Sequence, residues 1–465
     1  MSASDPAAIL RAGFSGQLIQ PGDAGYDASR QVFNGMHDKR PALIARCACA
    51  ADVAAAVTFA RQQQLQIAVR SGGHSVAGLS TCEGGILIDL AGLKQITVDP
   101  EARTARAGGG VLWGEFDAAT QAHGLHTPGG RVTTTGVGGF TTGGGYGWTS
   151  SKYGLTCDNL LSAQVVLADG RIVTASERDE PDLFWGIRGG GGNFGIVTEF
   201  EYRLHPLGPI VLAGLMLWPI ERAGEVMRAW RDYADRSPDE VSTACAILTA
   251  PPEPFVPDSL KGQVAIGIIG MYVGDPDEGA RALQPLKDLG PAVDLIQPMP
   301  YTVFQAMIDA AAPKGLRNYW RGEYLATLPD GAIDAFVQHG TALTAAAMPL
   351  GQMIVFRIGQ GVAAVAEDAT AFSHREAHYL FHPIAVWNEP ADDQRLIAAS
   401  RAFCDVMRPF ATGGAYLNFT PEDRVREGYG DAKYERLVGL KDRYDPDNLF
   451  RLNQNIRPSL RTASA

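Results

Sequence analysis

The first 207 residues carry short apolar runs of strand length, separated by segments with a helical repeat. Runs at 41–47 and 67–70 flank residues 51–64, where apolar positions recur every three to four residues. This pattern predicts a strand–helix–strand unit, with a helical segment and then a loop before it in residues 5–40. Such a unit delivers its following loop to a strand end, where α/β sheets tend to bind ligands.

Two further pairs of apolar runs are separated by turn-forming residues. Residues 96–107 turn at Pro100-Glu101, and residues 159–175 turn at Ala168-Asp169-Gly170. Both patterns predict antiparallel hairpins. The remaining elements predicted in this region are a strand at 85–90, a helix at 111–123 and a strand at 196–204.

From about residue 208 the pattern changes to longer elements with proline-rich loops between them. The predicted strands are 210–218, 241–249, 263–272, 321–326, 352–359 and 377–387, and the predicted helices are 221–236, 277–289, 301–309 and 329–347. Alternation of strands and helices along one long sheet indicates an α+β domain.

Glycine, aromatic and asparagine residues return near the C-terminus. We therefore expect three segments: 1–207, a second domain at 208–410, and 411–465 returning to the first, with a frayed tail at 458–465.

Composition narrows the functional classes. The net charge is −11, with no block of like charge, so nucleic-acid or anionic-membrane binding is not expected. No apolar run is long enough to span a bilayer, and residues 1–19 lack the pattern of a secretory signal. The six cysteines are scattered, and Cys47 and Cys49 are too close for an ordinary disulfide, so we expect reduced thiols in a cytoplasmic protein.

The 54 glycines are clustered rather than repeated. One cluster, Arg70-Ser71-Gly72-Gly73-His74-Ser75, follows a predicted strand, and its backbone N–H groups can form a concave nest for anionic oxygens. Arg70 would add charge, and His74 would reach the bound group. The alternative is a glycine-rich turn with a histidine there by chance.

Two more glycine clusters lie at 126–147 and 188–195. They suit backbone that wraps a large bound group. A mobile linker would instead be rich in serine and poor in aromatic residues, and these clusters are interleaved with aromatics.

Together with Ala415-Tyr416-Leu417-Asn418-Phe419 and the stretch 444–450, these clusters resemble the berberine bridge enzyme-like flavoproteins of the vanillyl-alcohol oxidase / p-cresol methylhydroxylase superfamily. The matching pieces span nearly the whole chain. The resemblance implies an α+β fold, with a two-part p-cresol methylhydroxylase-type FAD-binding domain and a substrate domain whose large antiparallel sheet is covered by helices.

The resemblance also implies that FAD is the cofactor, that the nest at 70–75 holds its pyrophosphate, and that His74 is joined covalently to its 8α-methyl. A non-covalent neighbour of FAD is the alternative for His74. The other residues implied to contact the cofactor are Gly130, Val132, Thr135, Gly136, Gly139, Gly143, Gly144, Gly145, Tyr146, Gly192, Gly195, Ile196, Val197, Tyr416, Asn418 and Asn453.

Many members of the family carry a second covalent link, from a cysteine to flavin C6. Val132 stands at that position, and valine cannot form a thioether. We therefore expect a singly linked flavin, as in the bacterial 6-hydroxynicotine oxidase-like branch.

Such a flavin takes a hydride from a carbon that bears an O–H or N–H group while a base removes the proton. Tyr416 is the first candidate for the base by resemblance, and the alternative is a tyrosine that only packs against the flavin. His374, His378 and His382 form a second candidate group, and we expect one or two of them to line the substrate pocket, with His374 equally compatible with a structural role. Metal binding is not expected, because no carboxylate or cysteine spacing supports it.

Oxygen is the usual electron acceptor in this family, and the small Thr135 would leave it access. The expected reaction is oxidation of a small alcohol or amine with release of H2O2. A sugar or oligosaccharide oxidase and a dehydrogenase are alternatives, and a flavoprotein with a non-redox cyclisation or ligand-binding role is a third. Neither a particular substrate nor an oligomeric state is indicated by the sequence.

Overall fold

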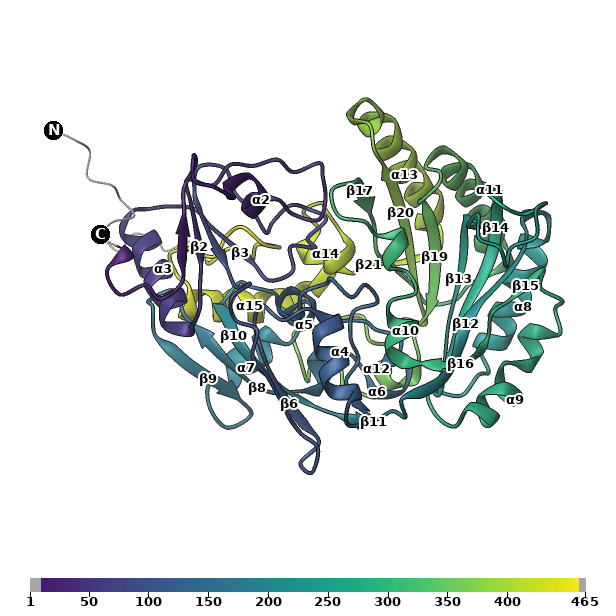
Figure 1. Cartoon of the computed structure of the whole chain (residues 1–465), viewed down its shortest axis with the longest axis horizontal. Coiled ribbons are helices and arrows are strands. Elements are labelled where there is room, and N and C mark those ends of the chain that lie inside the picture. Colours follow the sequence, from purple (N-terminus) through teal and green to yellow (C-terminus); the bar gives the residue numbers. More distant parts are fainter. Residues whose placement is uncertain (1–9, 460–465) are drawn as a thin grey trace.

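The computed structural model describes residues 10–459, and residues 1–9 and 460–465 of the predicted lead-in and tail lie outside them. Figure 1 shows two halves side by side. The glycine-loop half contains the purple and blue elements together with the yellow C-terminal helices. The large-sheet half contains the teal and green elements.

A four-stranded sheet opens the glycine-loop half. Its strand order is β1 (Gln17–Ile19), β2 (Leu43–Arg46), β4 (Ile86–Asp89) and β3 (Ile67–Arg70). β2 and β3 each pair in parallel with β4, and helix α3 (Ala50–Gln62) connects them. The predicted strand–helix–strand unit is therefore confirmed, with β4 inserted between its two strands.

The segment before this unit differs in part from its prediction. Its described part begins with helical residues at positions 10 and 11, as predicted, but the predicted loop contains β1 and the short helix α2 (Tyr26–Arg30). β1 pairs antiparallel with β2 and so covers the edge of the sheet. Pairing with a distant strand overrides the local preference of these residues.

A five-stranded antiparallel sheet follows, and both predicted hairpins form within it. Its order is β5 (Ile96–Asp99), β6 (Thr104–Gly108), β10 (Ile196–Arg203), β8 (Leu160–Val166) and β9 (Ile172–Ser176). The two short strands β7 (Leu125–His126) and β11 (His205–Pro206) pair with each other. The accompanying helices are α4 (Trp113–Gln121), α5 (Val137–Thr142), α6 (Ser150–Tyr153), the 3-10 turn η1 (Thr156–Asn159) and α7 (Pro181–Ile187).

Within the described residues, ten strands form the sheet of the large-sheet half. They are β12 (Ile210–Pro219), β13 (Val241–Thr249), β14 (Val264–Tyr272), β15 (Val293–Asp294), β16 (Gln297–Pro300), β17 (Arg317–Trp320), β18 (Glu323–Leu325), β19 (Gln352–Arg357), β20 (Tyr379–Trp387) and β21 (Ala411–Ala415). All the strands predicted between 208 and 410 form. The pattern did not reveal the short strands β15, β16 and β17, which add to the long ones only through tertiary pairing.

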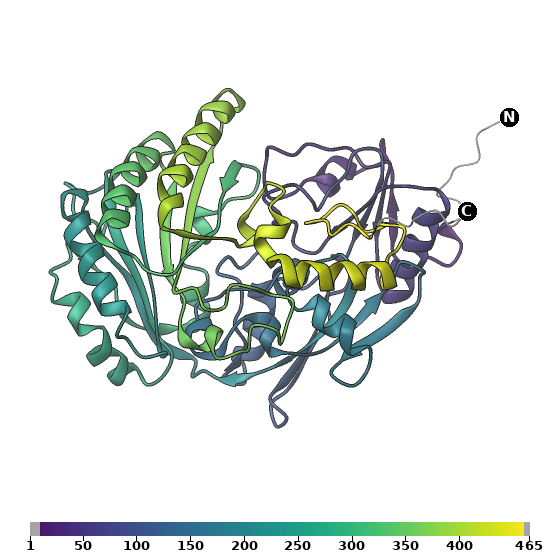
Figure 2. The same ribbon diagram turned by 180° about the vertical axis from the view of Figure 1, so that it is seen from behind.

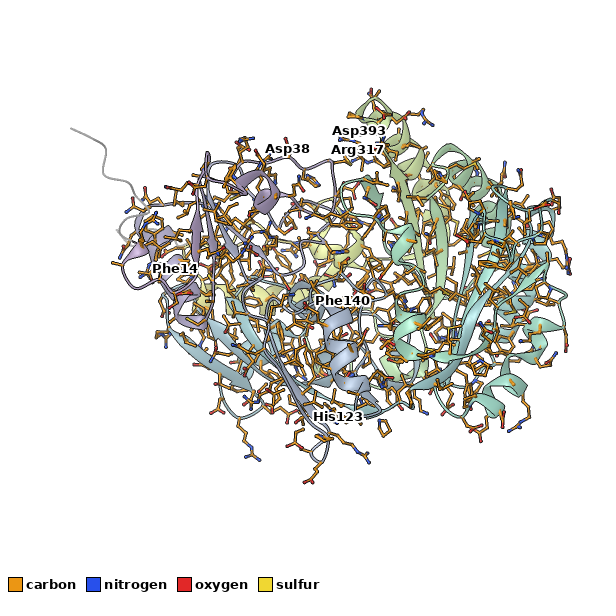
Figure 3. The ribbon with its side chains drawn as sticks, in the orientation of Figure 1. Phe14, Asp38, His123, Phe140, Arg317 and Asp393 are labelled. Carbon is orange, nitrogen blue, oxygen red and sulfur yellow. The ribbon has the colours of Figure 1, made fainter. Side chains whose placement is uncertain are left out.

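Helices cover one face of this sheet (Figure 1). The helices and 3-10 turns of this half are η2 (Ile220–Arg222), α8 (Ala223–Ala234), α9 (Pro276–Lys287), α10 (Tyr301–Gln305), η3 (Asp309–Ala311), α11 (Asp330–Ala346), α12 (Gln360–Ala363), η4 (Pro390–Asp392), α13 (Asp393–Met407) and η5 (Arg408–Phe410). α13 was not predicted. An ion pair between Arg317 of β17 and Asp393 joins it to the sheet (Figure 3).

The two faces of the large sheet bury different side chains. On β19, Met353 and Val355 pack in the core beneath the helices, whereas Ile354 and Phe356 point to the opposite face and pack with Tyr146 and neighbours of the glycine-loop half. Side chains alternate across a strand, so β19 serves both cores at once.

The C-terminal segment crosses back to the glycine-loop half, as Figure 2 shows in yellow. The turn η6 (Leu417–Phe419) leads to α14 (Val425–Tyr429) and α15 (Asp431–Tyr444). Leu437 and Leu440 of α15 are buried with Phe184 and Phe194 of the first half. The expected boundaries at 207/208 and 410/411 stay predictions, and β21 itself belongs to the large sheet.

No helix of residues 10–459 is long and apolar enough to cross a membrane.

Candidate active site

A cavity of about 370 Å³ is lined by both halves. This volume lies within the range of small-molecule and cofactor sites. Most of the residues that the sequence assigned to a cofactor line it. They are Ser71, Gly72, Gly73, His74, Ser75, Gly130, Val132, Thr135, Gly136, Gly139, Gly143, Tyr146, Gly192, Gly195, Ile196, Val197, Asn418 and Asn453.

The loop after β3 presents free backbone donors to this cavity. In the part of the chain that the structure describes, nothing accepts a hydrogen bond from the backbone N–H groups of residues 72–75. Unpaired N–H groups in a tight turn form an anion-binding concavity. The turn is closed by a backbone contact, because a Cβ on Gly72 would lie 2.2 Å from the amide nitrogen of Gly136.

His74 stands at the edge of this nest. Its ring stacks on Phe33 with centroids 4.2 Å apart, and its Nε2 lies 2.8 Å from Thr134 Oγ1. Desolvation by the surrounding protein, and then the charge of Lys314, lowers the pKa of His74 to about 4. The imidazole is therefore neutral near pH 7, which is the form able to make a new bond through nitrogen.

Four residues assigned to the cofactor, Arg70, Gly144, Gly145 and Tyr416, do not line the cavity. Arg70 turns into the domain, where its Nη2 lies 2.8 Å from the fully buried carboxylate of Asp89, so its charge is already paired. This corrects the expectation that Arg70 adds charge to the nest. Gly144 and Gly145 lie behind the wall, where a Cβ would meet Phe372 and Thr156 at 2.4 Å.

Tyr416 also lies behind the wall, although Asn418 beside it faces the cavity. Its hydroxyl oxygen accepts hydrogen bonds from the backbone N–H groups of Gly145 and Tyr146, both at 3.3 Å, and from Asn418 Nδ2 at 3.2 Å. Burial raises the pKa of Tyr416 to about 12, while the bond from Asn418 acts in the opposite direction. In this arrangement the phenol holds the glycine turn and the asparagine in place.

The structure separates the three candidate histidines. His378 is exposed, and the Nε2 of His374 faces the backbone oxygen of Glu427 at 2.8 Å, so neither lines the cavity. The expected pocket position is corrected for both, because His374 and His378 precede β20 and only His382 lies within it. His382 does line the cavity, as expected for one or two members of this group. In the described residues no three His, Cys, Asp or Glu side chains gather as a metal site.

The wall opposite the glycines comes from two paired strands of the large sheet. Every second residue of each strand faces the cavity, and Ile354 of β19 pairs with His382 of β20. The full set is Gln352, Ile354 and Phe356 of β19 with His382, Ile384 and Val386 of β20. Alternation of apolar residues was visible in the sequence, but not which of the two alternating sets would face the site.

His382 is held in one tautomer. Its Nδ1 lies 2.6 Å from the backbone oxygen of Arg321, so Nδ1 carries the proton and Nε2 keeps a lone pair. The ring stacks on Phe419 with centroids 3.9 Å apart. Burial lowers the pKa of His382 to about 3, so the ring is a neutral hydrogen-bond acceptor at ordinary pH.

Comparison with known proteins assigns these motifs to a family. A model of an FAD binding domain matches residues 41–176, and a model described as berberine and berberine like matches residues 415–457. The chain is 31% identical over 468 residues to (R)-6-hydroxynicotine oxidase of Paenarthrobacter nicotinovorans, covering 95% of this chain and 97% of that protein. The chain belongs to the berberine bridge enzyme-like family of FAD-linked oxidoreductases.

Solved structures agree with this membership. The crystal structure of 6-hydroxy-D-nicotine oxidase from Arthrobacter nicotinovorans has a TM-score of 0.84 and 28% identity, and covers 98% of this chain and 99% of that one. Xylooligosaccharide oxidase from Myceliophthora thermophila C1 reaches 0.85 at 22% identity with coverage of 98% and 99%, and shows the fold alone. The α+β architecture with a p-cresol methylhydroxylase-type FAD-binding part is confirmed.

The cavity fits the FAD of this family. A Cβ added to Gly139 or Gly192 would meet no protein atom within 4 Å, and both residues line the cavity, so bare backbone leaves room for a large ligand there. The amide oxygen of Asn453 is buried at the same wall without a hydrogen-bond partner. Together with the free N–H groups of residues 72–75, these positions form a cradle for a polar, flat group.

Proposed function

We propose that this FAD-linked oxidoreductase is an oxidase of a small organic alcohol or amine. One observation carries the proposal: a single cavity joins the glycine nest beside His74 to the side chains of β19 and β20. Bound FAD would accept a hydride from the substrate carbon, and its reoxidation by O2 would yield H2O2 from that hydride and the proton of the substrate O–H or N–H.

We infer that His74 is the covalent anchor of the cofactor and that it is the single one. Its neutral ring borders the nest, which supports this role. Val132 lines the cavity where a second link would need a cysteine, and none of the six cysteines lines it. The free thiols also support a reducing compartment such as the cytoplasm.

Acid precipitation tests the anchor. The expected result is that flavin absorbance stays with the precipitated protein, that the intact mass includes one FAD, and that His74→Ala releases all its flavin. Thr134→Val is the matched control, since it removes a neighbour of His74 but leaves the imidazole. Flavin that separates from the unmodified protein in acid would overturn the covalent link and leave FAD binding intact.

For the proton we propose His382 as the group that accepts a hydrogen bond from the substrate O–H or N–H. Its Nε2 lone pair is available, and no Asp or Glu of residues 10–459 lines the cavity. Tyr416 then contributes through Asn418, which it contacts at 3.2 Å. The small Thr135 lines the cavity and supports access of O2.

An oligosaccharide oxidase is the second candidate. It rests on likeness of fold to xylooligosaccharide oxidase. The wall of β19 and β20 is mostly apolar, with Ile354, Phe356, Ile384 and Val386, which favours a compact and partly apolar substrate over a polyhydroxylated chain.

An anaerobic and aerobic screen of alcohols, amines and sugars tests the function. A substrate should bleach the flavin without oxygen and yield H2O2 in air. Bleaching without peroxide would indicate a dehydrogenase with another acceptor. Binding of a ligand that never bleaches the flavin would indicate a non-redox role and overturn the proposal.

A further inference from the structure

Arg131 is the one residue with a permanent charge among the described residues that line the cavity. The two histidines there are neutral, because burial lowers the pKa of His74 to about 4 and that of His382 to about 3. The protein wall around the substrate end therefore has a net positive charge.

The guanidinium is held firmly but without an anion. Nη1 donates to the backbone oxygen of Tyr146 at 3.1 Å and Nη2 to that of Gly147 at 3.2 Å. Its central carbon lies 4.1 Å from the ring centroid of Phe356, 4.4 Å from that of Tyr146 and 4.6 Å from that of Trp148. The residue as a whole is 7% exposed.

No carboxylate compensates this charge. In residues 10–459 no Asp or Glu oxygen lies within 4.0 Å of the Arg131 guanidinium, and its Nε is buried without a hydrogen-bond partner. A guanidinium has five N–H donors, so two backbone bonds leave three free. Aromatic faces and carbonyl dipoles offset part of the cost of burying a cation, but an anion would offset more.

We propose that Arg131 binds a carboxylate of the substrate, so that the enzyme oxidises small hydroxy or amino acids. This inference rests on the proposed oxidase function. Arg131 and His382 both contact Phe356, whose ring centroid lies 6.3 Å from that of His382. A short substrate can therefore place its carboxylate at the guanidinium and its O–H or N–H at His382 Nε2.

Two other roles for Arg131 make different predictions. A purely structural clamp would stabilise the contact between the glycine loop and β19 without any preference for anionic ligands. A role toward the reduced cofactor would change the flavin potential and sulfite affinity, equally for charged and neutral ligands.

The test compares two ligands of matched shape on the flavin-loaded protein. Benzoate and its neutral analogue benzamide are titrated while the flavin spectrum is followed, with calorimetry as a second readout. We expect benzoate to bind about 10- to 100-fold more tightly than benzamide. Arg131→Met should abolish that difference, and Arg131→Lys should keep part of it because the charge remains.

Arg188→Met is the matched control. Arg188 also lies over an aromatic ring, 4.3 Å from the centroid of Phe184, and donates to the backbone oxygen of Ala369 at 3.1 Å, but it does not line the cavity. This variant should keep the preference for benzoate. If Arg131→Met fails to fold, the affinities of Arg131→Lys and of the unmodified protein for benzoate and benzamide test the inference instead.

Equal binding of benzoate and benzamide by the unmodified protein would overturn the inference, and so would a preference for benzoate that survives in Arg131→Met. A change in sulfite affinity with unchanged ligand preference would assign Arg131 to the cofactor instead. If neutral alcohols bleach the flavin and acids do not, the proposed oxidase stands and the carboxylate inference fails.

Discussion

The two walls of the cavity are built by different means. The glycine-loop wall uses backbone, with free N–H groups at residues 72–75 and bare Cα positions at Gly139 and Gly192. The β19 and β20 wall uses side chains from every second residue, including His382 and Phe356. A backbone site needs glycine at particular positions and so leaves a motif. A side-chain site can be remade by changing one residue without altering the fold.

The largest effect is expected at the backbone wall. A Cβ on Gly136 would lie 2.1 Å from the amide nitrogen of Gly72, so Gly136→Ala should separate the two loops and cost about 3 kcal/mol of stability. The ratio of flavin to protein absorbance should fall close to zero, and thermal unfolding should shift downward.

Gly139→Ala is the matched control for this wall. Gly139 lines the cavity, and a Cβ there would meet no atom of the surrounding elements within 4 Å. It should lower flavin loading with little change in the melting temperature of the flavin-free protein. Equal loss of stability in both variants would show that the glycines serve folding rather than ligand space.

In the wall formed by β19 and β20, His382→Leu should still bind the flavin but reduce it more slowly with substrate. Removing the Nε2 acceptor should slow anaerobic flavin reduction about 100-fold, within the usual range for a group that assists proton transfer. Stopped-flow absorbance measures the rate, and His378→Leu is the control, because that ring is exposed outside the cavity. Unchanged reduction in His382→Leu would remove it from the proton path.

Tyr416→Phe probes the boundary between the walls. The substitution leaves the N–H groups of Gly145 and Tyr146 without their acceptor, which should cost about 1–3 kcal/mol. Because the phenol lies behind the wall, we expect flavin reduction to slow about tenfold or less through displacement of Asn418. A far larger loss with unchanged stability would restore Tyr416 as the base.

The smallest expected effect is a dependence of the free energy of unfolding on pH. Burial lowers the pKa of His126 to about 3, against about 6.5 in an unfolded chain. Below pH 6.5 the imidazole of His126 binds a proton in the unfolded chain but not in the folded one. The free energy of unfolding is therefore highest above pH 6.5 and falls as the pH is lowered toward 3, by up to about 1.4 kcal/mol per pH unit.

Urea unfolding at pH 7.5 and 5.5 measures this loss. It should be smaller in His126→Gln than in the unmodified protein. His123→Gln is the control, because His123 is exposed. Equal pH dependence of the unmodified protein and His126→Gln would contradict the assignment.

Most of the backbone wall could be predicted because its demands are local. A loop that must approach another within van der Waals contact needs glycine at both Gly72 and Gly136, and such positions are visible in a single sequence. The error at Arg70 has a physical reason as well. Its distant partner Asp89 lies on the neighbouring strand β4 and takes the charge away from the nest.

The side-chain wall could not be predicted in the same way. His374, His378 and His382 are equivalent at i, i+4 spacing until the start of β20 and its pairing with β19 are known. The sequence did not single out Arg131, although it precedes Val132. Its role in the cavity depends on the absence of a nearby carboxylate and on aromatic rings contributed by residues 146, 148 and 356.

The sequence by itself determined the family, the cofactor class, the long strands and the glycine-lined cradle. These follow from local steric and hydrogen-bonding requirements that only a few residue types satisfy. The tertiary structure alone decided which side chains face the cavity, that Tyr416 stands behind its wall, and that the charge of Arg131 is unpaired. These properties depend on strand register and on contacts between residues far apart in the chain, where packing rather than local preference selects the outcome.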